Sequence, residues 1–99
     1  MATGIVVKID EPKVNSWQSG VFIRIYFKMG DGTWGQTDVV PTFRNYVYWK
    51  PIIESGPDTK VENLAYKTHS KLKGKIDADC KPRIVEKVAP YDNKQSPLL

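Results

Sequence analysis

Residues 21–28 follow a period of two, and this pattern constrains the fold more than any other feature of the chain. One set of alternate positions is apolar throughout: Val21, Ile23, Ile25 and Phe27. The other set mixes aromatic rings with cations: Phe22, Arg24, Tyr26 and Lys28. Because successive side chains of a strand point to opposite faces of a sheet, the pattern predicts a strand with a core face and a chemically different outer face.

Composition extends this expectation to the whole chain. Val and Ile total 18 residues and Leu and Ala only 8, and 11% of the residues are aromatic, so the apolar content is typical of strands. At 99 residues the chain has the length of one small domain, so we do not expect a multidomain enzyme. We therefore expect an all-β domain with one short helix.

The order of the expected elements follows from turn signals and breaks in periodicity. Strands are predicted at residues 3–10, 21–28 and 33–40, with a loop at 12–20 and a hairpin turn at 30–32. The returning strand carries Trp34, and whether this residue shares a face with Tyr26 depends on the hairpin register.

The second half begins with a predicted helix, for which Thr42 is the expected N-cap and Pro51 the expected break or kink. Phe43, Tyr46 and Val47 form its predicted core stripe. Residues 59–70 read as a long connection with a short strand near Leu64. Alternation then predicts strands at 71–80 and 83–88, the domain ends near residue 89, and residues 90–99 form a flexible tail.

The segments FIRIYFKMGDGTWG and LKGKIDADCKPRIVEK, in the order β-β-β-α-β-β, resemble the oligonucleotide/oligosaccharide-binding (OB) fold. That fold is a five-stranded Greek-key barrel with a helix between its third and fourth strands. The chain is similar in particular to small single-stranded-DNA-binding proteins of this fold, including bacteriophage versions. The resemblance implies binding and protection of single-stranded DNA in replication, recombination or repair. It does not extend to an acidic partner-recruiting tail, because residues 93–99 include no carboxylate side chain.

The residues also favour single-strand binding, because aromatic faces stack unpaired bases and cations follow the phosphates. Lysines gather late in the chain, where residues 67–83 carry six cations and two carboxylates. We therefore expect base stacking on Phe22, Tyr26 and Trp34. Phosphate neutralisation is expected from Arg24, Lys28, Lys71, Lys73, Lys75 and Arg83. The ligand is single-stranded DNA or, alternatively, RNA, and binding is expected to be independent of base sequence.

Several alternatives stay open at this stage. The same aromatics could form a protein-interaction or assembly surface, including a homo-oligomer, since Tyr, Trp and Arg are also enriched at interfaces. Trp17, Tyr48 and Trp49 could contact the ligand, a partner or the core. The lysine face could instead only prevent edge-to-edge pairing of strands.

Catalytic chemistry has little support in the sequence. Asp77 and Asp79 stand two residues apart, a spacing too common to define a metal site. Cys80 is expected to face inward, which argues against a catalytic dyad with His69. We expect no enzyme, cofactor or metal. The chain has no apolar run long enough for a membrane span, and with a single cysteine we expect a cytoplasmic protein, in the host cytoplasm if it is viral.

Overall fold

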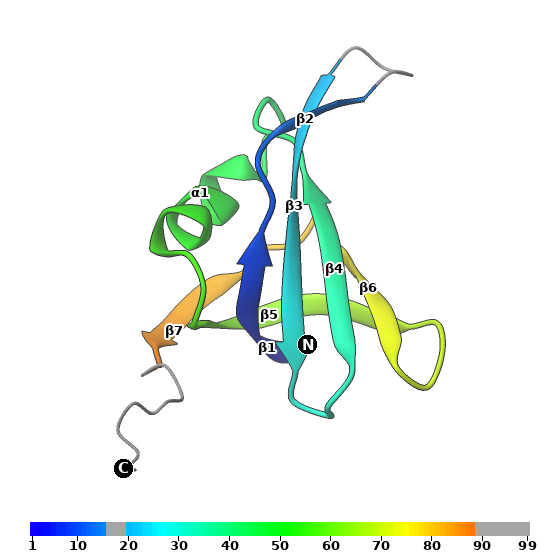
Figure 1. Ribbon diagram of the computed structural model, residues 1–99. Helices are drawn as coiled ribbons and strands as arrows, with labels where there is room; N and C mark the ends of the chain where they lie inside the picture. The colour runs from blue at the N-terminus through cyan, green and yellow to red at the C-terminus, as the bar shows by residue number, and fades with distance from the viewer. Residues whose placement is uncertain (16–19, 89–99) are drawn as a thin grey trace, which may run out of the picture.

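The computed structural model describes residues 1–15 and 20–88, which form seven strands and one helix (Figure 1). The elements in chain order are β1 (Ala2–Ile9), β2 (Lys13–Asn15), β3 (Gly20–Met29), β4 (Trp34–Val39), α1 (Tyr46–Ser55), β5 (Thr59–Thr68), β6 (Lys73–Asp77) and β7 (Arg83–Lys87). In the part of the chain so described, no helix has the length and apolarity needed to cross a bilayer.

Five of the strands close into a barrel in the order β1-β3-β4-β6-β5, with β5 returning to pair with β1. The pairing of β4 with β6 is parallel, and the other pairings around the barrel are antiparallel. The helix lies between the third and fourth barrel strands in chain order. These features confirm the predicted OB-like five-stranded barrel with one helix.

The barrel interior contains the inward-facing set of the central hairpin, as the alternation predicted. Ile25 and Phe27 on β3 are fully buried, and Ile23 is nearly so. The prediction was wrong for Val21, which is 42% exposed because it pairs with Val14 on the short strand β2 rather than facing the barrel core. Trp49 of α1 meets the ring of Phe27 edge to face, with 6.4 Å between the centroids. The helix therefore closes the barrel by placing its largest side chain in the core.

The strand β5 corrects the expectation of a long connection at 59–70. Thr59 and Val61 face inward in its first half, but Asn63 adopts a left-handed conformation with φ of 66° and the inward set becomes Leu64 and Tyr66. The register against β1 shifts at the same place. This bulge inserts one extra residue and breaks the period of two, which is why the sequence looked irregular.

Of the last two predicted strands, only the first belongs to the closed barrel. The fifth barrel strand is β6, shorter than the predicted 71–80, because residues 69–72 form the turn after β5 and Leu72 is exposed. The strand β7 lies outside the closed barrel and pairs with the first half of β5. The long, bulged β5 can accommodate β7 and β6 in succession along one edge.

The helix begins later than predicted, at Tyr46, with Asn45 rather than Thr42 as its N-cap, and it runs past Pro51 to Ser55. The predicted core stripe was wrong in part: Phe43 and Val47 are about two-thirds exposed, at 65% and 64%. The buried stripe follows the later start and consists of Trp49 and Ile52, with Tyr46 and Ile53 packed beside them.

The predicted loop at 12–20 also contains structure. The short strand β2 pairs with the start of β3, and the two strands form an arm that extends beyond the barrel at the top of Figure 1. Trp17 and the predicted tail at 90–99 lie outside the described residues.

Candidate nucleic-acid interface

The outer face of β3 carries the predicted aromatic and cationic side chains. Phe22, Arg24 and Tyr26 are partly exposed and Lys28 is exposed, while the residues between them are buried. The alternation thus separates a packed interior from a surface available to a ligand.

The hairpin register settles which face Trp34 occupies. Lys28 is the direct partner of Trp34 across the β3–β4 pair, and Tyr26 is the partner of Gln36. Side chains of directly paired residues project on the same side of a sheet, so Trp34 shares the outer face with Tyr26. Trp34 is 46% exposed, and the Lys28 Nζ lies 4.3 Å from the centroid of its ring.

The parallel pairing of β4 with β6 brings the distant lysines to the same face. Trp34 pairs with Lys73, Gln36 pairs with Lys75, and Lys75 in turn pairs with Lys67 on β5. We name this surface the aromatic–lysine face and define it as Tyr26, Lys28, Trp34, Gln36, Lys67, Lys73 and Lys75. It crosses β3, β4, β6 and β5 (Figure 1).

The turn between β5 and β6 is fixed beside this face. The backbone N–H of Trp34 donates to the carbonyl of Leu72 over 2.8 Å. Lys71 directly precedes Leu72 in the chain, so its backbone lies at the edge of the face. The Tyr66 hydroxyl donates to the carbonyl of Trp34 over 3.3 Å. The Tyr66 ring occupies space left by Gly74, where a Cβ would lie 2.6 Å from its Cε1 atom. The backbone under Trp34 is therefore anchored from both sides.

The lysines of the aromatic–lysine face have no carboxylate partner among residues 1–15 and 20–88. The ion pairs found there, with N···O distances of at most 4.0 Å, involve Lys8, Lys13, Arg24 and Arg83 instead. Uncompensated charges next to exposed rings are the arrangement that attracts phosphates and stacks bases.

A line of carboxylates borders the face toward the β2–β3 arm. Arg24 donates through Nε and Nη2 to both oxygens of Asp38, at 2.7 and 3.1 Å, and this hydrogen bonding raises the pKa of Arg24 above its ordinary value. Asp10 accepts a hydrogen bond from the Tyr26 hydroxyl at 3.2 Å and has Lys8 and Lys13 each at 3.4 Å. Arg24 is thus already neutralised within the protein.

Four predicted residues lie outside the aromatic–lysine face: Arg24 and Lys71, described above, and Phe22 and Arg83. Phe22 pairs with Lys13 at the root of the arm, and its ring centroid lies 5.6 Å from the Arg24 guanidinium carbon. Arg83 lies on β7 and hydrogen bonds to Glu62 on β5. Conversely, Lys67 and Gln36 belong to the face although the predicted site did not include them; only the register of β5 and β6 reveals their position.

The other residues weighed for catalysis are Asp77, Asp79, Cys80 and His69. No cluster of three or more metal-ligating side chains occurs in residues 1–15 and 20–88, which include Asp77 and Asp79. Cys80 is buried, as predicted, and its burial raises the pKa of the thiol. His69 is exposed in the turn after β5.

The fold and this surface define a mainly β protein, a closed five-stranded OB-like barrel with an exposed aromatic and cationic face. Comparison of the chain with protein-family models, with curated proteins and with solved structures finds no match. The functional argument therefore rests on the chemistry of the site.

Proposed function

We propose that this protein binds single-stranded DNA without sequence specificity and protects it during replication, recombination or repair. The observation that carries the proposal is the register that aligns exposed Trp34 with Lys28 on one side and Lys73 on the other. Bases would stack on Trp34 and Tyr26, and Lys67, Lys71, Lys73 and Lys75 would neutralise the phosphates. Single-strand sites of this kind extend over about 4–16 nucleotides per barrel.

The electrostatic layout supports a path across the strands. Lysines predominate from β3 to β5, and the carboxylates of Asp10 and Asp38 lie along the border nearer the arm. The cations at that border are already paired with these carboxylates, whereas the lysines of the aromatic–lysine face have no carboxylate partner among the described residues, so a phosphate chain would follow the lysines.

A labelled single-stranded 20-mer and a duplex of the same length test the proposal by fluorescence anisotropy at low and moderate salt. We expect tighter binding of the single strand, and affinity that falls steeply with salt because bound lysines release condensed counterions. Equal affinity for both forms would contradict base stacking, since bases inside a duplex are not available to Trp34.

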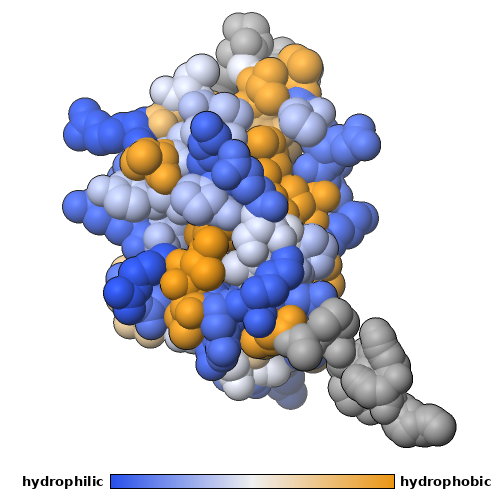
Figure 2. Space-filling view, turned by 90° about the vertical axis from the view of Figure 1, so that its left-hand side faces the viewer, coloured by the Kyte–Doolittle hydropathy of each residue, from blue (hydrophilic) through white to orange (hydrophobic). Residues whose placement is uncertain are grey.

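A second candidate, a protein-interaction or assembly module, is favoured by the exposure of Phe43, Val47 and Tyr48 around the start of α1. Figure 2 views the side of the molecule on which α1 and β7 lie, and apolar groups there alternate with hydrophilic ones. Protein–protein interfaces usually have a larger continuous apolar patch than these separated groups provide. This candidate would be supported by a stable oligomer whose mass, measured by size-exclusion chromatography, does not change with salt. The oligomer should dissociate when Tyr48 is replaced by Ala. Trp49 cannot report on it, because that residue is core.

A further inference from the structure

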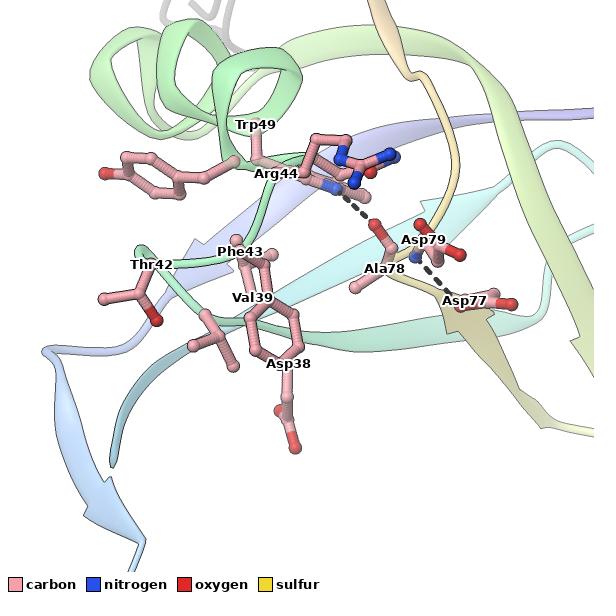
Figure 3. A pocket seen from close by; sticks show the side chains of 12 residues that line it. Asp38, Val39, Thr42, Phe43, Arg44, Trp49, Asp77, Ala78 and Asp79 are labelled. Atoms are coloured by element: carbon pink, nitrogen blue, oxygen red, sulfur yellow. Dashed lines mark hydrogen bonds between the residues drawn. The ribbon is translucent and has the colours of Figure 1, made fainter. Parts of the chain in front are cut away.

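A cavity of about 620 Å³ opens where β4 leads into the segment before α1, opposite the end of β6. Figure 3 shows Phe43, Val39 and Asp38 on one side, Ala78 and two aspartates on the other, and Arg44 between them. The volume lies within the range of about 300–1,000 Å³ that small-molecule sites occupy. The volume is thus large enough for a nucleobase with its sugar.

The cavity has an aromatic wall and a fixed apolar floor. Phe43 is 65% exposed, an unusual position for a phenylalanine with no described partner ring. The floor is held by Trp49, whose Nε1 donates to the Ala78 carbonyl over 2.9 Å, as drawn in Figure 3. This part-buried hydrogen bond joins α1 to the segment after β6 and holds the floor of the cavity in place.

The charged rim consists mainly of acceptors. Asp77 and Asp79 contribute carboxylates, as does Asp38, which is already paired with Arg24, and Arg44 is the one cation among the lining residues that the structure describes. Asp77 Oδ1 accepts from the backbone N–H of Asp79 over 2.9 Å, which fixes that carboxylate and leaves its second oxygen available. Carboxylates repel phosphates but accept hydrogen bonds from exocyclic amino groups, such as N4 of cytosine.

The cavity continues the aromatic–lysine face rather than standing apart from it. Asp38 shares the outer face of β4 with Gln36 and Trp34, four residues or about 13 Å away along the strand. A strand whose phosphates lie on the lysines can therefore direct a base toward the cavity.

We infer that this cavity binds one base of the DNA strand and prefers bases that carry an exocyclic amino group, cytosine above all, over thymine or uracil. The inference rests on the proposed function and adds a base preference at one position to otherwise non-specific binding. Phe43 stacks on the base, Asp77 and Asp79 accept from its amino group, and Arg44 offsets their charge.

The test compares homopolymers of deoxycytidine and deoxyuridine of equal length at pH 7.5, because the two bases share ring size and backbone. We expect the full-length protein to bind the cytosine polymer at least about fivefold more tightly. In the D77N/D79N double variant the ratio should fall to about one, because an amide also donates to the uracil carbonyl. The amide introduced at position 77 can still accept the backbone hydrogen bond from position 79 through its oxygen, so the local fold is preserved. E54Q/E86Q, which removes two exposed carboxylates elsewhere, is the charge-matched control and should keep the preference.

The outcomes separate the two proposals. Equal affinity of the unmodified protein for both polymers, or a preference that D77N/D79N leaves intact, would overturn the base pocket and leave single-strand binding standing. Failure to bind either polymer at low salt would overturn the proposed function itself. A Phe43→Leu variant provides the second check: it should weaken cytosine binding more than uracil binding, whereas equal weakening counts against the pocket.

Discussion

Lys28 and Trp34 face each other across the central hairpin, with the ammonium nitrogen 4.3 Å from the centroid of the indole ring. This cation–π contact orients a half-exposed tryptophan on the outside of the barrel. The ring is not part of the buried core, so under the proposed function it is available to stack a base.

Replacing Trp34 with Ala should therefore reduce affinity for single-stranded DNA without unfolding the protein. Loss of one stacked base corresponds to about 1–3 kcal/mol, which raises the dissociation constant by roughly fivefold to 150-fold. Anisotropy titration measures the affinity and thermal melting the stability. A variant that binds as tightly as the parent would show that Trp34 does not contact bases.

The paired substitution of Lys73 and Lys75 by Ala should lower the salt dependence of binding. Each lost phosphate contact reduces the slope of log affinity against log salt by about 0.7 for a single strand. Arg83→Ala is the matched control, because Arg83 lies on β7 and is paired with Glu62. If Arg83→Ala lowered the slope as much as the lysine pair, the binding path would have to include β7.

Gly74→Ala should destabilise the barrel strongly. A Cβ at this position would lie 2.5 Å from the Lys67 carbonyl oxygen and 2.6 Å from the Tyr66 ring, and neither the strand nor the packed ring can yield easily. Overpacking of this kind costs about 1–3 kcal/mol or more. At Gly30 the nearest atom would be 3.7 Å away, so Gly30→Ala is the control. Equal melting temperatures for the two variants would contradict the close packing of Tyr66 against β6.

The hydrogen-bonded Asp10 predicts a stability change in acid. Desolvation acts to raise the pKa of Asp10, but hydrogen bonds from Tyr26, Lys13 and Lys8 outweigh it and hold the pKa below 3.8. The unfolded chain therefore binds the proton more readily, and the stabilisation is present above about pH 4 and lost as pH falls through the lower folded value.

Urea denaturation of the parent and of Asp10→Asn measures this effect. The parent midpoint should exceed that of the variant at pH 7, and the difference should narrow by pH 3. A difference that stays constant between these pH values would show that the charge of Asp10 does not stabilise the folded state.

Much of the architecture was predictable from local patterns. The period of two in β3 and the glycine turn before Trp34 predicted the central hairpin, and the number of barrel strands and the single helix were correct. The identity of the later strands was not predictable, because the bulge at Asn63 hides β5 from any periodic analysis. The helix was misplaced since Phe43 is apolar yet lies before the helix and outside the core.

The candidate site was predictable in composition but not in arrangement. The outward set of β3 and the lysines of β6 follow from alternation alone. Their meeting depends on the parallel β4–β6 pairing, a contact between segments nearly forty residues apart that no local pattern encodes. For the same reason the site predicted from the sequence included Arg83, which lies on β7 in the fold. It omitted Lys67, which lies beside Lys75.

The most direct test of base stacking on this face is intrinsic tryptophan fluorescence during titration with single-stranded DNA, for the parent and for Trp34→Phe. Buried Trp49 should respond little. We predict quenching of the parent that weakens with salt and is much smaller with duplex DNA, and loss of most of the quenching in Trp34→Phe. Absence of quenching at low salt, or quenching that Trp34→Phe retains in full, would contradict the account.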